Sequence, residues 1–450
     1  MTRVTDAPGR PSDATVRRPH PLPKRPLRNA ATVLIGRGAR FLTRLRGGGT
    51  AFPGLIVEHL DRDFAARALA QLPYGVVVIS GTNGKTTTTR VVTELLRGQG
   101  LAVFTNPSGS NYSRGVVSAL LGRVDLLGRL DADVAVLELD EAHGVLFADA
   151  VPPRFALLLN VLRDQLDRFG EIDHTAELLQ AIAARTTGAV VLNRDDRRIA
   201  AIAASLPHTP VRFFGVGASL AGRFPGDDEM HGREQQHQAV HDADVLLTAI
   251  DSARATFDFD GTSHAVDLRL RGSYNMVNAA AAIALVRAVL GDGVEDTELL
   301  RTLSAVTPAF GRGETIEVHG TAVELVLVKN PAGFRLAIQS FDAADCATVI
   351  AINDHDNDSR DVSWLWDVDF GSLRHPGVDL VTGTRAAEMA LRLRYDDVPV
   401  AHVESDLRRA LDRALALAGG RPLRIYCTYT AMLQLRRLLA AMTPLEGIDR

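Results

Sequence analysis

The stretch YGVVVISGTNGKTTTTRVVTELLRGQG, residues 74–100, contains the pattern that decides the fold. Its apolar start, residues 74–80, predicts a buried strand, and the part from Thr86 to Gly100 predicts a helix that stops at a glycine. Between them lies G-T-N-G-K-T, a short form of the P-loop, in which backbone amides and a helix N-terminus bind phosphate. We expect Lys85 to meet the β- and γ-phosphates of ATP and the Thr86 hydroxyl to meet Mg²⁺. The predicted nucleotide-binding residues of this loop are Gly81, Thr82, Asn83, Gly84, Lys85, Thr86 and Thr87.

More apolar runs follow at the spacing of alternating strands and helices, at residues 101–105, 133–139, 155–160 and 188–193. Such nearly continuous runs are typical of a parallel sheet that is buried on both faces. Ligands of these sheets bind at the carboxyl ends of the strands, where Glu138 and Asn160 lie. We predict Glu138 as the second Mg²⁺ ligand; the alternative is a carboxylate that merely ends its strand.

Length and composition predict a water-soluble protein of two or three domains, since 450 residues exceed one ordinary core. We see no apolar run of about 18 residues, the length that a membrane-spanning helix needs, and no signal peptide. Cys346 and Cys427 form no ligand spacing, and we expect two buried thiols in a reducing compartment.

The N-terminal residues are strongly basic. Residues 1–50 contain eleven Lys or Arg and two Asp, so their net charge is +9, against −13 for the rest of the chain. We expect a disordered basic tail over 1–29 and a helix with a linker over 30–54. This helix would either rest on an anionic membrane or pack its Leu and Phe side against the following domain.

Five motifs resemble the ATP-dependent Mur ligase superfamily, and they occur in its order: GTNGKTTT, LELDE, NVLRDQLDRFGEID, GSYNMVNAAAA and GRGE. The resemblance implies a ligase that converts a carboxylate and ATP into an acyl phosphate, which an amine then attacks. It implies a central ATP-binding domain over 55–306 and a smaller α/β C-terminal domain over 307–450. It also implies that Asn278 contacts the adenine and that Arg312 reaches the ATP phosphates, with Asn160 in the same site.

The chain departs from that superfamily in three respects. The N-terminal segment leaves no room for the usual first domain, which binds a uridine nucleotide. Asp164–Gln165–Leu166–Asp167 stands where a metal-binding D-H-L-D is usual, and no lysine lies between Lys85 and Lys329 to be carbamylated. We therefore expect a differently completed metal site and no nucleotide-sugar substrate.

The stretch INDHDNDSRDVSWLWDVDF, residues 352–370, combines both tryptophans of the chain with many aspartates. A calcium loop starting at Asp354 would need a glycine and a glutamate where Ser359 and Leu365 stand, so this interpretation fails. The segments LVKNPAGF (327–334), VTGTRAAEMALRLRY (381–395) and IYCTYTAM (425–432) indicate a second alternation of strands and helices.

Together these C-terminal segments resemble the MurT family, the ligase subunits of lipid II isoglutaminyl synthase. The resemblance implies a GatD-like glutaminase partner that supplies ammonia, and it matches Asp361 to the aspartate that completes the partner's catalytic triad. A carboxylate behind the histidine of such a triad orients it and stabilises its charged form. Exposed Trp364 and Trp366 would suit the interface. The alternative is that both indoles are core and the acids form a solvated loop.

Three further places in the sequence carry predictions. Lys329 would act electrostatically near the acyl phosphate, or else it is a surface lysine at a helix N-terminus. The loop 105–111, TNPSGSN, is a candidate substrate contact. We predict a flexible insertion over 216–245 and no zinc, because His231, His237, His241 and Asp242 match no zinc spacing.

The resulting expectation is an enzyme with ATP and Mg²⁺ that amidates the D-glutamate α-carboxyl of the lipid II stem peptide to D-isoglutamine. It would act at the inner face of the cell membrane, with no nucleic-acid partner. The alternatives are a ligase that adds an amino acid, similar to folylpolyglutamate synthase, and a nucleotide-binding scaffold without catalysis.

Overall fold

The structure, a computed structural model, describes residues 24–45, 52–106, 112–163, 172–224, 240–308, 312–340, 346–355, 358 and 361–445. The chain divides into two compact units, and the main division falls between Val306 and Thr307. Residues 162, 163, 172 and 269–276 belong to the second unit although they precede that division.

The first unit contains a nine-stranded sheet in the order β2-β3-β1-β4-β5-β6-β7-β8-β9. Strands β1 to β7 pair in parallel, and β8 and β9 add an antiparallel hairpin at one edge. The strands are β1 (Val76–Ser80), β2 (Val103–Thr105), β3 (Val134–Glu138), β4 (Phe155–Leu158), β5 (Ala189–Asn193), β6 (Val211–Val216), β7 (Val245–Asp251), β8 (Arg254–Phe259) and β9 (Thr262–Asp267).

Strands β1, β3 and β4 are buried along their whole length, which explains their unbroken apolar sequences. The four parallel strands predicted from apolar runs exist, with ends that differ by one or two residues. The helices of this unit are α1 (Pro26–Leu45), α2 (Phe52–Leu60), α3 (Phe64–Leu69), α4 (Lys85–Gly98), α5 (Ser113–Arg123), α6 (Glu141–Ala150), α8 (Ile172–Ala184), α9 (Arg197–Ala201), α11 (Ser273–Leu290) and α12 (Asp296–Ala305).

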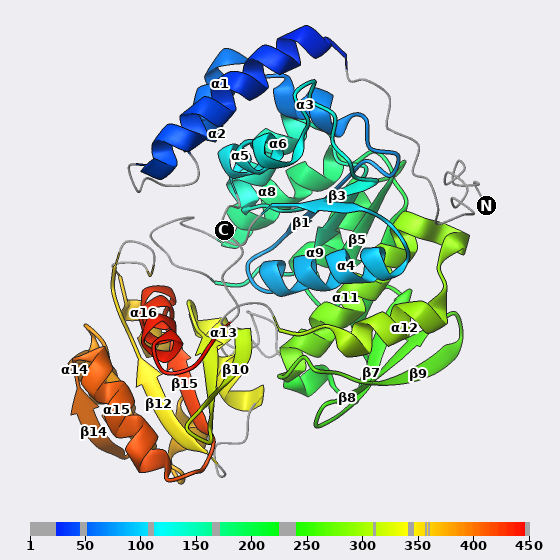
Figure 1. Cartoon of the computed structure of the whole chain (residues 1–450). Helices are drawn as coiled ribbons and strands as arrows, with labels where there is room; N and C mark the ends of the chain where they lie inside the picture. The colour runs from blue at the N-terminus through cyan, green and yellow to red at the C-terminus, as the bar shows by residue number, and fades with distance from the viewer. Residues whose placement is uncertain are drawn as a thin grey trace. The chain divides into compact units, whose positions relative to one another are not determined.

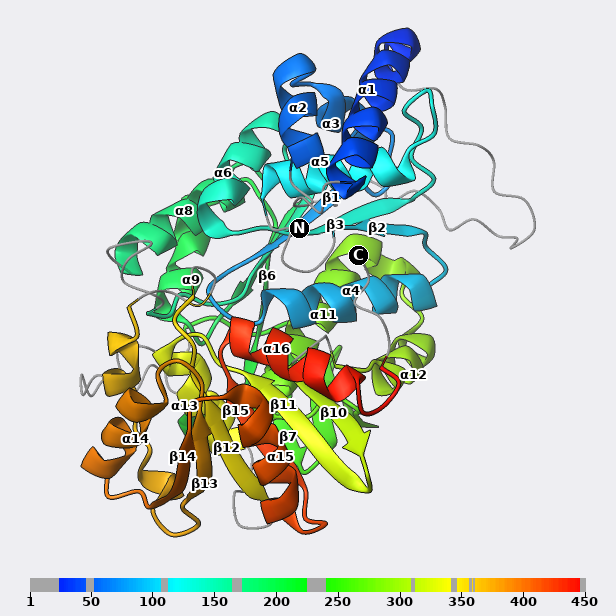
Figure 2. The same cartoon turned by 60° about the vertical axis from the view of Figure 1, so that its left-hand side comes forward.

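Helices cover both faces of this sheet. Helices α4, α11 and α12 lie on one side, and α5, α6 and α8 lie on the other (Figure 1). Helices α1 and α2 pack beyond α5 at the far edge of that second layer, as both views show (Figure 2). The three layers place the carboxyl ends of β1, β3 and β4 at one edge of the sheet, where the P-loop begins.

Helix α11, with the short turn that follows it to Gly293, is long and apolar enough to cross a membrane by composition, which the apolar-run criterion did not detect. Its residues from Ala279 to Val286 are almost fully buried within the unit, and two thirds of the apolar window is covered. Burial of this kind is typical of a core helix in a globular protein.

The N-terminal helix differs from the prediction in two ways. It begins at Pro26, four residues before the predicted start, because proline favours the first turn of a helix and Asn29 is already buried there. Its Leu and Phe side chains do not pack against the domain: Leu34 and Phe41 are exposed, so the packing interpretation is wrong. Residues 1–23 of the predicted tail lie outside the described residues.

The second unit contains a six-stranded sheet in the order β10-β11-β15-β12-β13-β14. The hairpin β10–β11 is antiparallel, and the other pairs are parallel. Its elements are β10 (Arg312–Val318), β11 (Thr321–Leu327), α13 (Pro331–Ser340), β12 (Ala347–Ala351), η4 (Ser363–Asp367), η5 (Gly371–Leu373), β13 (Val378–Thr382), α14 (Ala386–Tyr395), β14 (Val400–Glu404), α15 (Leu407–Ala418), β15 (Leu423–Cys427) and α16 (Tyr429–Ala440).

Each face of the smaller sheet carries a core of its own. One core joins Phe334, Phe370, Met389 and Tyr426, and the other joins Leu325 and Ala414 with residues of α16. Both cysteines are buried, as predicted, and they do not form a disulfide with each other. The expected α/β fold, with a mainly parallel sheet and a smaller α/β unit at the C-terminus, is confirmed.

Candidate nucleotide site and candidate partner surface

The P-loop spans Gly81–Gly84, directly between β1 and α4. Gly81 has φ +132° and Gly84 has φ +89°, in the region where a side chain is strained. A Cβ on Gly84 would also lie 2.5 Å from Oδ1 of Asn278 on α11. The two glycines therefore allow both the turn and the close approach of α11, and the predicted adenine contact Asn278 lies against the phosphate loop.

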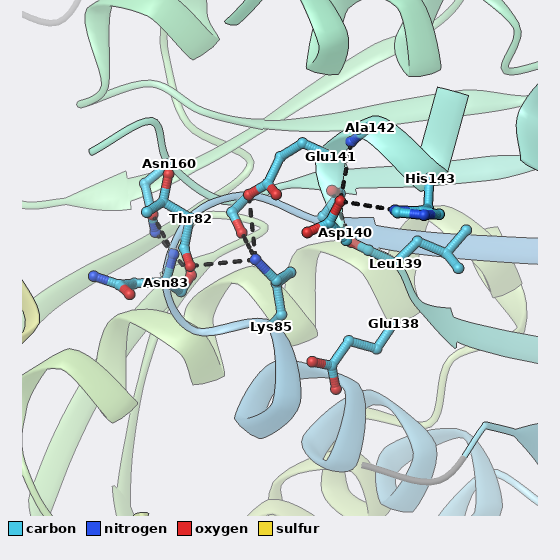
Figure 3. A network of polar contacts seen from close by, with 12 residues as sticks. Thr82, Asn83, Lys85, Glu138, Leu139, Asp140, Glu141, Ala142, His143 and Asn160 are labelled. Atoms are coloured by element: carbon cyan, nitrogen blue, oxygen red, sulfur yellow. Dashed lines mark hydrogen bonds and ion pairs between the residues drawn. The ribbon is translucent and has the colours of Figure 1, made fainter. Parts of the chain in front are cut away.

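Asn160, at the end of β4, holds the loop in place. Its Oδ1 accepts a hydrogen bond from the Asn83 backbone N–H at 2.9 Å, and its Nδ2 donates to the Asn83 carbonyl at 3.1 Å. Its own carbonyl accepts from the Thr82 N–H at 3.0 Å. Figure 3 shows this amide beside the loop. Asn160, predicted to bind the nucleotide, is thus a residue that positions the loop.

Lys85 begins α4 and is buried. Its Nζ donates to the carbonyls of Gly81 and Thr82 and to Oε1 of Glu141, the last at 3.2 Å (Figure 3). These acceptors hold the ammonium over the loop, where phosphate oxygens would approach it. Glu141, the first residue of α6, was not predicted as a site residue. Glu141 is the last residue of the motif LELDE, but the sequence did not show that the position of α6 places its carboxylate next to Lys85.

Thr86 and Glu138, the two predicted Mg²⁺ ligands, lie in contact with each other. The Thr86 hydroxyl donates to Oε1 of Glu138 at 2.9 Å, and both side chains are buried. Asn106, just after β2, accepts from the Glu138 N–H and donates to the Glu138 carbonyl, both at 3.0 Å. Asn106 belongs to the predicted substrate loop, and its place here is a backbone support of Glu138. Residues 107–111 of that loop lie outside the described residues.

The chemistry of this pair fits Mg²⁺. A hydroxyl and a carboxylate are hard oxygen donors, and Mg²⁺ typically takes only one or two carboxylates besides water and substrate phosphates. Within the described ranges no group of three or more His, Cys, Asp or Glu side chains is arranged to hold a metal. A site completed mostly by phosphate oxygens and water therefore suits these residues. Asp164, Gln165 and Asp167 lie outside the described residues.

The remaining predicted residues of this site have varied surroundings. Thr82 within the loop and Thr87 in the first turn of α4 are both buried. Arg312 opens β10 in the second unit, and its side chain is not among those described. Asp140 caps α6 by accepting from the Ala142 N–H at 3.2 Å, and it contacts Nδ1 of His143 (Figure 3).

In the second unit, the aspartates of residues 352–370 have different surroundings. Asp358 is buried and accepts hydrogen bonds from the N–H and the hydroxyl of Thr430 at the start of α16. Asp354 accepts from the Thr384 hydroxyl at 2.8 Å and from Nε of Arg385 at 2.9 Å. These two carboxylates join loops at the carboxyl end of the sheet and act structurally.

Asp361 is exposed on the surface. Its Oδ1 accepts from the Ser363 N–H at 2.8 Å, and this bond, followed by the bond to the Ser363 side chain, holds the pKa of Asp361 below its ordinary value. The side chain is therefore an oriented carboxylate, charged at neutral pH. This is the state that a triad histidine requires of its aspartate.

The two tryptophans have different roles, so neither interpretation of the pair is right for both. Trp364 is 4% exposed and packs in the core with Phe334, whereas Trp366 is 42% exposed. The Trp366 ring meets Tyr395 edge to face at 5.2 Å. Lys329 lies half-buried, two residues before α13.

Half of the predicted insertion over 216–245, namely residues 225–239, lies outside the described part of the chain. His241 stacks on Phe213 with ring centroids 4.4 Å apart.

Three features of the chain are typical of ATP-dependent ligases of the Mur type: a P-loop between a strand and a helix, a hydroxyl–carboxylate pair suited to a cation, and a second α/β unit. The family description "Mur ligase middle domain" matches residues 79–286, and "MurT ligase C-terminal" matches residues 327–432. The chain is 30% identical to the lipid II isoglutaminyl synthase (glutamine-hydrolyzing) subunit MurT of Streptococcus pneumoniae, over 92% of this chain and 98% of that protein. The chain belongs to the MurT family of Mur ligases, which confirms the resemblance seen in its motifs.

Solved structures agree on the fold. MurF from Acinetobacter baumannii superimposes with a TM-score of 0.66 at 20% identity, covering 87% of this chain and 80% of that one. MurF ligase from Thermotoga maritima, solved in complex with ADP, gives 0.63 at 18% identity, covering 85% and 84%. The Mur ligase fold predicted from the sequence is therefore confirmed.

Proposed function

We propose that this chain is the ligase subunit of a lipid II isoglutaminyl synthase. It would use MgATP to activate the D-glutamate α-carboxyl of the lipid II stem peptide and then add ammonia, which gives D-isoglutamine. The observation that carries the proposal is the match to the Streptococcus pneumoniae MurT subunit along nearly the whole chain, with the P-loop site intact. The glutamine-hydrolysing name of that relative supports glutamine as the nitrogen source.

In the first step a substrate carboxylate oxygen attacks the γ-phosphorus of ATP, and the bond to the β-phosphate oxygen breaks to release ADP. Lys85 and the amides of the P-loop stabilise the charge that spreads over the transferring group. Thr86 and Glu138 would hold Mg²⁺, which when bound neutralises part of the phosphate charge. Asn160 and Asn106 keep the loop and Glu138 in position throughout.

In the second step the nitrogen of ammonia attacks the carbonyl carbon of the acyl phosphate. Inorganic phosphate leaves, and the nitrogen loses a proton as the amide forms. The departing phosphate takes up that proton, so the products are the amide and hydrogen phosphate.

A GatD-like glutaminase would supply the ammonia, in a heterodimer or a larger assembly. Asp361 would complete its triad by accepting a hydrogen bond from the partner's histidine. Three properties support this role: the side chain is exposed, oriented by Ser363 and charged at neutral pH. Exposed Trp366 and Tyr395 nearby in the same unit would pack against the partner.

The enzyme would act in the cytoplasm at the inner face of the cell membrane, because lipid II is anchored there. A ligase that adds an amino acid would share the P-loop site but would not need an exposed triad aspartate. A nucleotide-binding scaffold would not turn over ATP in response to an acceptor carboxylate.

The test is amidation of lipid II by the full chain with MgATP, comparing ammonium with glutamine, each with and without a GatD-like subunit. We expect ammonium to suffice without the subunit and glutamine to require it. Amide formation with glycine or glutamate instead of ammonium would favour the amino-acid ligase. ATP binding without turnover under every condition would favour the scaffold.

A further inference from the structure

Helix α1 is attached to the first unit by one narrow side. Thr32 and Val33 are buried, and the Thr32 hydroxyl donates to Oδ2 of buried Asp61 at 2.8 Å. Gly36 lies so close to α2 and α5 that a Cβ would be 2.6 Å from Leu121 and 2.9 Å from Val57. The contact is therefore close, and the helix has a defined orientation on the unit.

Arg37 strengthens this attachment at the end of α5. Its guanidinium donates to the carbonyls of Leu121 and Val124, at 3.2 and 2.6 Å. On the other side of the helix start, Arg67 and Arg28 pair with Asp61. The polar contacts that Arg28, Thr32 and Arg37 make thus lie on or beside the buried side of α1.

The opposite side of α1 is apolar and exposed. Leu27, Leu34 and Phe41 recur every seven residues and so lie in one row, with 82%, 61% and 64% of each side chain exposed. Gly36 lies half a turn around the helix from Leu27, which shows that the row points away from the unit. We define the outer face of α1 as the exposed residues Leu27, Leu34, Ile35, Phe41 and Leu42.

The charge around this face has one sign. Residues 24–45 contain six Lys or Arg and no Asp or Glu, in a chain whose net charge is −4. Lys24, Arg25, Arg28 and Arg37 are exposed, although Arg28 also pairs with Asp61 at 2.8 Å and Arg37 also donates to the two carbonyls at the end of α5. An apolar face with basic flanks fits a surface that is negatively charged outside and apolar inside, which is the surface of an anionic bilayer.

We propose that the outer face of α1 is a membrane-docking surface, with the helix lying in the plane of an anionic bilayer and its Leu and Phe side chains among the acyl chains. Four arginines within the helix are incompatible with spanning but suit an interfacial position. A second copy of this chain fits less well, because a two-fold contact through this face would bring like charges together. The proposal rests on the proposed function in one respect: a lipid-anchored substrate would require the enzyme to work at the membrane surface.

The test measures co-sedimentation of the full chain with phosphatidylcholine vesicles that contain or lack phosphatidylglycerol. We expect binding to the anionic vesicles, weakened by salt. The double variant Leu34→Ser, Phe41→Ser should bind about tenfold more weakly or worse, since two apolar side chains no longer enter the bilayer. Because both side chains are exposed, its thermal unfolding should match the wild type.

The matched control is Leu146→Ser on α6, whose side chain is 64% exposed, as much as that of Phe41. It should bind vesicles like the wild type. The variant Lys24→Gln, Arg25→Gln should bind anionic vesicles more weakly and with less dependence on salt.

Three results would overturn the proposal: no wild-type binding to anionic vesicles, unchanged binding of the Leu34/Phe41 variant, or equal loss in the Leu146 control. Self-association of the wild type that the Leu34/Phe41 variant abolishes, measured by light scattering without vesicles, would assign the face to a second copy instead. The vesicle assay contains neither ATP nor lipid II, so it is independent of the ligase reaction. Amidation of a soluble muropeptide by the same variant reports on that reaction alone, and we expect it to be unchanged.

Discussion

The acidic side chains beside the P-loop, at residues 138–141, can be compared with Asp354, Asp358 and Asp361 of the second unit. In the first place, Glu138 and Glu141 are buried and meet Thr86 and Lys85 of the same chain. In the second place, Asp358 is buried in contacts with α16, while Asp361 stays exposed. Asp361, the carboxylate that we propose to serve the partner, thus differs from Asp358 in exposure and not in sequence pattern.

The largest expected effect is on the rate of amidation, and it should depend on the nitrogen source for a variant of Asp361 but not for a variant at the P-loop. Asp361→Asn should lower glutamine-dependent amidation about 10⁴-fold, the typical effect of losing a triad aspartate, and leave ammonium-dependent amidation unchanged. The measurement is the rate of amide formation with each nitrogen source in the presence of the glutaminase subunit.

Asp369 offers a matched control. It is also exposed and accepts from the N–H two residues later, that of Gly371, at 2.8 Å, as Asp361 does from Ser363. Asp369→Asn should therefore leave both reactions unchanged. An equal loss in both variants would mean that the partner responds to negative charge on this surface in general and not to the Asp361 carboxylate in particular.

A substitution at the P-loop should lower the rate of amidation equally with either nitrogen source. Lys85→Ala should lower amidation with ammonium and with glutamine by about 10²- to 10³-fold, because a preorganised charge on the phosphoryl group is lost. Lys85→Arg should not rescue activity, since a planar guanidinium does not fit the buried place of a compact ammonium. ADP release is the readout; a variant that loses only the glutamine reaction would contradict the assignment.

Asp358→Ala tests the structural carboxylate of the second place. It leaves the N–H and hydroxyl of Thr430 without this acceptor, so the free energy of unfolding should fall by about 2 kcal/mol. Urea unfolding measures the change, with Asp369→Ala as the exposed comparison. If the variant kept its stability but lost glutamine-dependent amidation, Asp358 would instead be assigned to the surface that contacts the partner.

Glu141→Gln should change nucleotide affinity modestly. Removing a negative charge 3.2 Å from Nζ of Lys85 should tighten ATP binding about fivefold, because the ammonium no longer shares its charge with a carboxylate. Titration calorimetry with ATP measures this. Weaker binding would mean that Glu141 chiefly positions Lys85.

The smallest expected effect concerns pH. Burial raises the pKa of Asp358, an effect that outweighs the hydrogen bonds from Thr430, so its carboxyl favours folding most when protonated. That contribution is present at low pH and is lost as pH rises through the raised pKa. Relative to Asp358→Asn, the wild type should therefore gain thermal stability between pH 7 and pH 4. A relative loss over that range would show that the carboxylate form is the stabilising one.

Much of the nucleotide site could be predicted because its signals are local. The G-T-N-G-K-T loop, its strand and its helix are adjacent in sequence, and the requirement for positive φ at Gly81 and Gly84 is visible as glycine. The pairing of Thr86 with Glu138 also followed, since parallel strands bring their carboxyl ends to one edge.

Other features depended on contacts between distant residues. Glu141 reaches Lys85 across 56 positions, and Asn106 reaches Glu138 across 32, because β3 lies between β1 and β2. The periodicity of α1 marked an amphipathic helix but not which side would be buried. The close approach of α2 and α5 at Gly36 determines which side of α1 is buried, so the side with Leu and Phe is exposed to solvent.

The sequence by itself determined the family, the P-loop chemistry and the presence of two α/β units, because strand hydrophobicity, loop glycines and motif order act locally. Tertiary structure alone decided which carboxylates are buried, that Trp364 is core while Trp366 is exposed, and which side of α1 faces solvent. The physical reason is that burial depends on which elements pack together, and neighbouring residues of one type can end on opposite sides of that packing.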